Sequence, residues 1–185
     1  MSTLGPLGKY EPINDWTPYI RDYKIALVTG EKEVSINKES VNFFKNELKF
    51  IKDNFPNDIL TGSLALNIYG LINRNISDID ILIEDEDRYS GYIKTLYGYA
   101  NDEVDNRLGY KSIKHRYGFF NLLSKKYVVD FFKKEEDMNT FSFEYDNHTY
   151  VLEHPISIIE KKANFNNRKS YIDLHNIFVG WFHED

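Results

Sequence analysis

The sequence predicts a mixed α/β (α+β) fold in which a mixed sheet packs on helices and the chain ends in a helical segment. Apolar residues recur at helical spacing in some segments and alternate as in strands in others, and the two kinds of segment interleave. The chain has 185 residues, 42% of them hydrophobic, which suits one compact domain. We divide it into an N-terminal extension (1–36), a core (37–153) and a C-terminal helical segment (154–185) that packs on the core.

The extension contains several turn-forming residues, followed by a segment at 23–29 that we interpret as a strand. A helix is predicted over about 38–54, with Asn37 as its N-terminal cap. Its apolar residues recur every three or four positions, which places them on one buried stripe: Val41, Phe44, Leu48, Ile51 and Phe55.

The centre of the chain begins with a short strand at 59–61 that runs into Gly62-Ser63 and a helix over about 64–71. A strand at 77–83 and a polar helix at about 86–99 follow.

Two or three strands are then predicted between about 109 and 132, and a hairpin follows with its turn at Asp146-Asn147. Pro155 fits the first turn of a helix that reaches about residue 165. A last helix over 168–181 has a buried stripe made of Leu174, Ile177, Phe178 and Trp181.

Composition excludes several classes of site. There is no cysteine, so disulfides, thiol nucleophiles and iron–sulfur clusters are ruled out. The histidines lack metal-ligand spacing, which argues against zinc: His115, His148, His154, His175 and His183. The net charge of −6 argues against a protein held on nucleic acid by bulk charge. No apolar stretch is long enough for a membrane span and no signal peptide is evident, so we expect no membrane partner and a cytoplasmic location.

Asp78 and Asp80 are the first candidate functional residues. Residues two apart on a strand face the same side, at roughly 6.6 Å spacing, so the isoleucines between and after them face a core. Two carboxylates this close repel each other unless a cation lies between them. Oxygen ligands of this kind suit Mg²⁺, which binds carboxylates together with substrate phosphates.

Gly62 and Ser63 lie where a strand turns into a helix, just before the aspartate pair. Glycine allows a tight turn and close approach of the backbone to a ligand. Free N–H groups at a helix start attract phosphate, and the Ser63 hydroxyl adds a hydrogen-bonding group.

Asp130 is the third candidate carboxylate, because it interrupts the apolar segment 128–132. An ionisable residue there is costly unless it is paired or binds a ligand. If this strand lies beside 79–83, three carboxylates converge as two-metal phosphoryl transfer requires.

These residues, in this order, resemble the signature of the polymerase-β-type nucleotidyltransferase superfamily. The sequence is most similar in appearance to its small bacterial and phage members, the AbiEii-type abortive-infection toxins. The resemblance covers about residues 57–180 and includes Arg74, Ser77, the lysines Lys161 and Lys162, and a run from Arg168 to Asp173 and Leu174. For Asp173 itself we expect an ion pair within its helix, with Arg168 or Lys169.

The resemblance implies a nucleotidyltransferase-type fold, an NTP as co-substrate and two Mg²⁺ ions. Asp78, Asp80 and Asp130 correspond to the metal-binding and catalytic carboxylates, and Gly62 and Ser63 to the phosphate-contacting turn. Arg74 and one of the two lysines, of which we select Lys162, correspond to nucleotide contacts. The implied acceptor is a hydroxyl of RNA, protein or a small molecule, and an antitoxin is an implied partner if the protein is a toxin or phage-defence enzyme.

Two alternatives remain open. An antibiotic nucleotidyltransferase of the lincosamide or aminoglycoside type would share the same core. A catalytically silent relative that only binds a partner is the alternative outside enzymes, and the costly clustered carboxylates argue against it.

Overall fold

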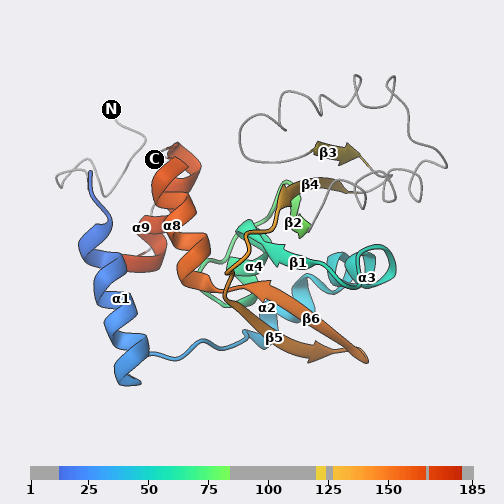
Figure 1. Cartoon of the computed structure of the whole chain (residues 1–185), viewed down its shortest axis with the longest axis horizontal. Coiled ribbons are helices and arrows are strands. Elements are labelled where there is room, and N and C mark those ends of the chain that lie inside the picture. Colours follow the sequence, from blue (N-terminus) through green and yellow to red (C-terminus); the bar gives the residue numbers. More distant parts are fainter. Residues whose placement is uncertain (1–12, 84–119, 124–126, 166, 181–185) are drawn as a thin grey trace.

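The computed structural model describes residues 13–83, 120–123, 127–165 and 167–180 (Figure 1). The helices in these ranges are α1 (Thr17–Thr29), α2 (Lys38–Phe43), α3 (Lys45–Asn54), α4 (Gly62–Ile68), α8 (Pro155–Phe165) and α9 (Arg168–Phe178). The strands are β1 (Ile59–Thr61), β2 (Ile79–Ile83), β3 (Phe120–Leu123), β4 (Val128–Lys133), β5 (Thr140–Tyr145) and β6 (His148–Glu153). The mixed α/β class with a helical C-terminal segment is therefore confirmed.

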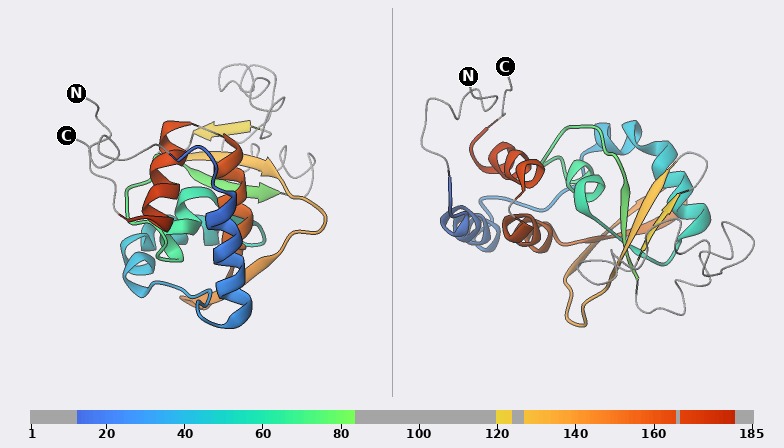
Figure 2. Two further views of the ribbon diagram at one scale, coloured as in Figure 1. Left: turned by 90° about the vertical axis from the view of Figure 1, so that its left-hand side faces the viewer. Right: turned by 90° about the horizontal axis from the view of Figure 1, so that it is seen from above.

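The strands form one sheet in the order β3-β4-β2-β1-β6-β5. The β2–β4 and β1–β6 pairs are parallel, whereas β1–β2, β3–β4 and β5–β6 are antiparallel, so the sheet is mixed. Helices α2, α3 and α4 lie against one face, and α1, α8 and α9 gather to one side (Figures 1 and 2). None of the helices in the described ranges has the length and apolar content that a membrane crossing requires.

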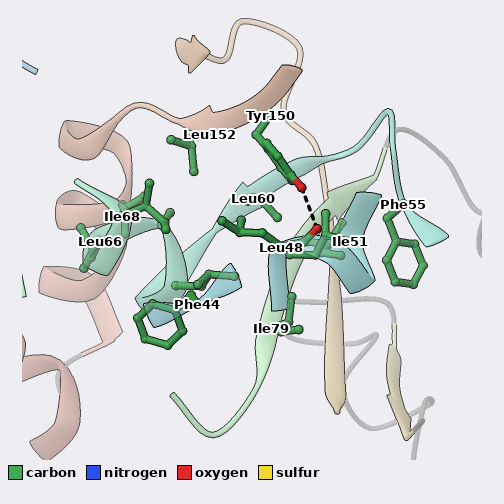
Figure 3. Packing of buried hydrophobic residues seen from close by; sticks show 14 of the residues in the cluster. Phe44, Leu48, Ile51, Phe55, Leu60, Leu66, Ile68, Ile79, Tyr150 and Leu152 are labelled. Atoms are coloured by element: carbon green, nitrogen blue, oxygen red, sulfur yellow. Dashed lines mark hydrogen bonds between the residues drawn. The ribbon is translucent and has the colours of Figure 1, made fainter. Parts of the chain in front are cut away.

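The main core lies between the sheet and helices α2–α4 (Figure 3). The residues predicted to form the stripe of the first core helix are all buried there. The stripe extends over two helices rather than one, because the backbone leaves helical geometry at Phe44, with φ −97° and ψ 22°. The Tyr150 hydroxyl donates a hydrogen bond to the Leu48 carbonyl (2.8 Å), which ties β6 to α3 and satisfies a buried polar group.

The predicted strand at 23–29 is wrong, because these residues belong to helix α1. Tyr23 and Ala26 are its buried residues, three apart as a helix requires. Tyr23 and Trp16 pack with Ile159 of α8 and Leu174 of α9 in a second apolar cluster. The β-branched and aromatic residues of this segment favour a strand locally, but packing against two other helices decides its conformation.

The other predicted caps and turns agree with the structure. The Asn37 side chain accepts a hydrogen bond from the Ser40 N–H, as predicted for a cap. Asp146 and Asn147 both have positive φ, 51° and 59°, and close the predicted hairpin between β5 and β6. The predicted helix at 86–99, most of the segment 109–132 before β4, and Trp181 lie outside the described residues.

Candidate active site

Register in the centre of the sheet brings the candidate residues together. Asp80 of β2 lies opposite Asp130 of parallel β4 and opposite Thr61 of antiparallel β1. Side chains alternate along a strand, so Ile79 and Ile81 enter the core while Asp80 faces the other side. The same alternation places Asp130 beside Asp80, because parallel neighbours in register share a face.

The three predicted carboxylates converge on one small volume. One oxygen from each of Asp78, Asp80 and Asp130 lies within 4.8 Å of the other two, and all three side chains are partly buried. Asp78 stands just before β2 and the other two aspartates lie on strands. The geometry that was predicted for this group is therefore present.

Electrostatics at Asp80 reflect this crowding. Burial raises the pKa of its carboxyl well above the ordinary value, and the charges of Asp78 and Asp130 raise it further. The positive charges of Lys162 and Lys169 act in the opposite direction. Asp80 is thus a carboxylate that would gain stability from a cation placed among the three oxygens.

Gly62 is required by the geometry of this group. Its φ of +66° belongs to the left-handed region that side chains disfavour. A Cβ at this position would lie 2.9 Å from the Asp80 Cγ and would collide with the carboxylate. The turn between β1 and α4 therefore touches the carboxylate cluster directly, and only glycine leaves room for Asp80.

Ser63 and Arg74, predicted as phosphate and nucleotide contacts, are joined to each other. The Arg74 Nη2 donates to the Ser63 Oγ (2.6 Å) and to the Asp173 Oδ2 (2.8 Å), and its Nε donates to the Asp173 Oδ1 (2.8 Å). Because a hydroxyl that accepts a bond keeps its own proton, Ser63 can still donate to a ligand.

Asp173 has different partners from those expected. In place of Arg168 or Lys169 of its own helix, it binds Arg74 and lies 2.9 Å from the Lys162 Nζ. Burial opposes its charge, but the hydrogen bond from Arg74 and the charges of Lys162 and Arg74 hold the pKa of Asp173 below its usual value. The within-helix expectation is wrong because Asp173 is buried and binds Arg74, in the segment after α4, and Lys162 of α8.

A cavity of about 380 Å³ opens beside the cluster. Its lining includes Gly62 and Asp80, both lysines of α8, and apolar side chains of the sheet and of α8: Leu82, Phe132, Ile158 and Phe165. A polar end at the carboxylates and an apolar remainder are typical of small-molecule sites.

Glu153 at the end of β6 is a residue of the site that sequence reasoning missed. Its side chain is fully buried, accepts a hydrogen bond from the Thr61 hydroxyl (2.5 Å) and lies 2.9 Å from the Lys161 Nζ. The only signal in the sequence is a glutamate that follows the apolar residues of a strand, which is also typical of an exposed strand end.

Lys169 is a second residue that was not predicted as part of the site. Its Nζ donates to the Ser77 Oγ (3.1 Å), next to Asp78. Lysines from α8 and α9 thus border the carboxylate cluster, although the chain as a whole is acidic.

The donor set fits a hard divalent cation. The oxygens of Asp78, Asp80 and Asp130 are the type of ligand that Mg²⁺ binds, and their mutual repulsion is relieved by positive charge. Among the residues that the structure describes, Asp78, Asp80 and Asp130 form the one group of acidic or histidine side chains whose ligand atoms lie close enough together to bind a metal ion.

Comparison with known proteins gave no match: no family model fits the chain, and no curated protein or solved structure is significantly similar to it.

Proposed function

We propose that this protein is a Mg²⁺-dependent nucleotidyltransferase that moves a nucleotide from an NTP to a hydroxyl group. The observation that carries the proposal is the convergence of Asp78, Asp80 and Asp130 within 4.8 Å of one another, beside the Gly62 turn. Chemistry on a triphosphate uses metal ions held by acidic side chains and a loop that contacts the phosphates closely, and this site offers groups of both kinds.

Asp78 and Asp80 would hold the Mg²⁺ ions, with Asp130 completing the ligand set. When bound, Mg²⁺ neutralises the charge that develops on the phosphates and makes the attacking hydroxyl more acidic. The resemblance to polymerase-β-type nucleotidyltransferases supports the same assignment.

Side chains of the site would orient the triphosphate and accept the proton. Ser63 donates its free O–H to a phosphate oxygen, and Arg74 fixes the Ser63 hydroxyl in place. The acceptor oxygen bonds to the α-phosphorus, the bond from that phosphorus to the bridging oxygen breaks, and pyrophosphate leaves. Asp130 takes the proton of the acceptor hydroxyl.

Label transfer tests the proposal. The full chain is incubated with Mg²⁺ and each α-labelled NTP, with total RNA, lysate proteins and a panel of aminoglycosides and lincosamides as acceptors. We expect one acceptor class to be labelled by the wild type and not by Asp80→Asn. Asp53→Asn, which removes a carboxylate from an exposed ion pair on α3, is the matched control and should retain transfer.

The class of labelled acceptor separates the enzyme types. Labelling of RNA or protein indicates a toxin or phage-defence enzyme, for which an antitoxin would be the partner, and labelling of a small molecule indicates antibiotic modification. Absence of transfer together with absence of nucleotide and metal binding would overturn the enzyme proposal and leave a silent binding protein.

A further inference from the structure

Two adjacent lysines of α8 extend toward different carboxylates. Successive helix residues point about 100° apart, as 3.6 residues per turn dictates. The Lys161 Nζ lies 2.9 Å from the Glu153 Oε2, and the Lys162 Nζ lies 2.9 Å from the Asp173 Oδ2. Each lysine thus has its own acidic partner on another element, β6 in one case and α9 in the other.

Lys162 forms an ion pair within the folded protein. Its side chain is only 11% exposed, and it shares Asp173 with Arg74. Lys162 is therefore committed to a buried carboxylate within the fold.

Lys161 is the more accessible of the pair. Its side chain is 34% exposed and contributes to the lining of the cavity beside Gly62 and Asp80. An ammonium carries three N–H donors, so one acidic partner does not exhaust its capacity to bind an anion.

Glu153, in contrast, has little freedom to move. Its other carboxylate oxygen accepts from the Thr61 hydroxyl, and its backbone carbonyl accepts from the Tyr69 hydroxyl (2.7 Å). Thr61 directly precedes the Gly62 turn. The carboxylate that faces Lys161 is therefore held to β1, and the backbone of Glu153 is held to Tyr69 at the end of α4, so both elements that flank the turn fix its position.

We propose that Glu153 is a positioning residue that directs Lys161 into the cavity, so that Lys161 rather than Lys162 is the lysine that binds the phosphates of the ligand. The inference rests on the proposed function, because that function supplies the phosphate-bearing ligand. A buried glutamate requires a partner, and the ion pair with Lys161 provides the partner and fixes the position of the ammonium.

Binding of inorganic triphosphate to the full chain, measured by calorimetry in Mg²⁺ buffer, tests the assignment. Lys161→Gln is expected to weaken binding about tenfold, since it removes one charge-assisted contact. Glu153→Gln keeps the acceptor for Thr61 but loses the charge, and should weaken binding to a similar extent. The double variant should be no weaker than either single one, because both act through one ammonium.

Comparison variants distinguish positioning from a general loss of charge or stability. Lys161→Arg should restore most of the affinity. Lys162→Gln should weaken triphosphate binding less than Lys161→Gln does, although it removes the same charge from the same helix. Lys49→Gln, which removes one exposed positive charge on α3, should bind as the wild type does. If Glu153→Gln does not fold, Glu153→Asp retracts the same charge by one methylene and should also weaken binding.

Several results would overturn the inference. These are wild-type affinity in folded Glu153 variants, additive losses in the double variant, or a larger loss in Lys162→Gln than in Lys161→Gln. In each of these cases the wild type still binds triphosphate, so the proposed function survives. Absence of triphosphate binding by the wild type would overturn both proposals.

Discussion

Two groups of carboxylates lie within the same small region and are built in opposite ways. Asp173 and Glu153 are fully buried, and each faces cationic side chains: Arg74 and Lys162 for the first, Lys161 for the second. Asp78, Asp80 and Asp130 are instead gathered with their oxygens facing one another.

The pKa values of Asp173 and Asp80, one from each group, are shifted in opposite directions. That of Asp173 is held below its usual value, despite burial, by Arg74 and Lys162. That of Asp80 is raised by burial and by its acidic neighbours. The first group stabilises the fold and ties α8 and α9 to the site. The second group crowds negative charge around Asp80, which is the pattern expected of residues kept for binding a ligand.

The largest expected effect is the loss of Asp173. Asp173→Asn leaves Arg74 and Lys162 without their acidic partner and should lower the free energy of unfolding by about 3 kcal/mol. Urea denaturation measures this loss. In the exposed pair on α3, Asp53→Asn should cost only about 0.3–0.5 kcal/mol. Equal losses in the two variants would show that Asp173 is not the anchor we describe.

Gly62→Ala should have the next largest effect. A side chain in the left-handed region costs about 1–2 kcal/mol, and the new Cβ also collides with Asp80. Gly30→Ala is a matched control, since Gly30 has φ +80° and open space where its Cβ would lie. The difference between the two free energies of unfolding isolates the collision. A smaller loss at Gly62 than at Gly30 would contradict the close packing of the turn against Asp80.

Removal of one charge from the group of Asp78, Asp80 and Asp130 should raise the free energy of unfolding rather than lower it. Asp80→Asn is expected to raise the free energy of unfolding by about 1 kcal/mol when divalent cations are absent, because like charges no longer repel at this separation. The comparison is made by urea denaturation in a chelator. A loss of stability in chelator would mean that Asp80 is held by favourable contacts, as Asp173 is.

The smallest effect concerns pH. Because the folded state holds the pKa of Asp173 below its unfolded value near 3.8, its contribution is fully present above that value and is lost as pH falls through the lower, folded pKa. The difference in free energy of unfolding between wild type and Asp173→Asn should therefore shrink below about pH 4. A difference that stays constant down to pH 3 would contradict the lowered pKa.

Local patterns predicted the carboxylate cluster because its signals lie within single segments. Alternation along 77–83 placed Asp78 and Asp80 on one side, and an apolar segment around Asp130 marked it as unusual. Gly62 was found as a turn former. Its contact with Asp80 depends on the antiparallel pairing of β1 and β2, which local sequence does not encode.

The paired carboxylates depend on contacts between distant segments. Asp173 is 99 residues from Arg74, and Glu153 is 92 residues from Thr61. Nothing near either residue in the sequence specifies these partners, so Asp173 was assigned to its own helix and Glu153 was missed. Helix α1 was missed for a related reason, since its conformation depends on packing against α8 and α9.

The central claim is that Asp78, Asp80 and Asp130 form a cation site. Binding of Mn²⁺, a paramagnetic substitute for Mg²⁺ at oxygen ligands, can be counted by electron paramagnetic resonance on the full chain in the presence of inorganic triphosphate. The wild type and Asp53→Asn should bind Mn²⁺ equally, and Asp80→Asn should bind about tenfold or more weakly. Equal binding by all three proteins, or no binding by the wild type, would contradict the account.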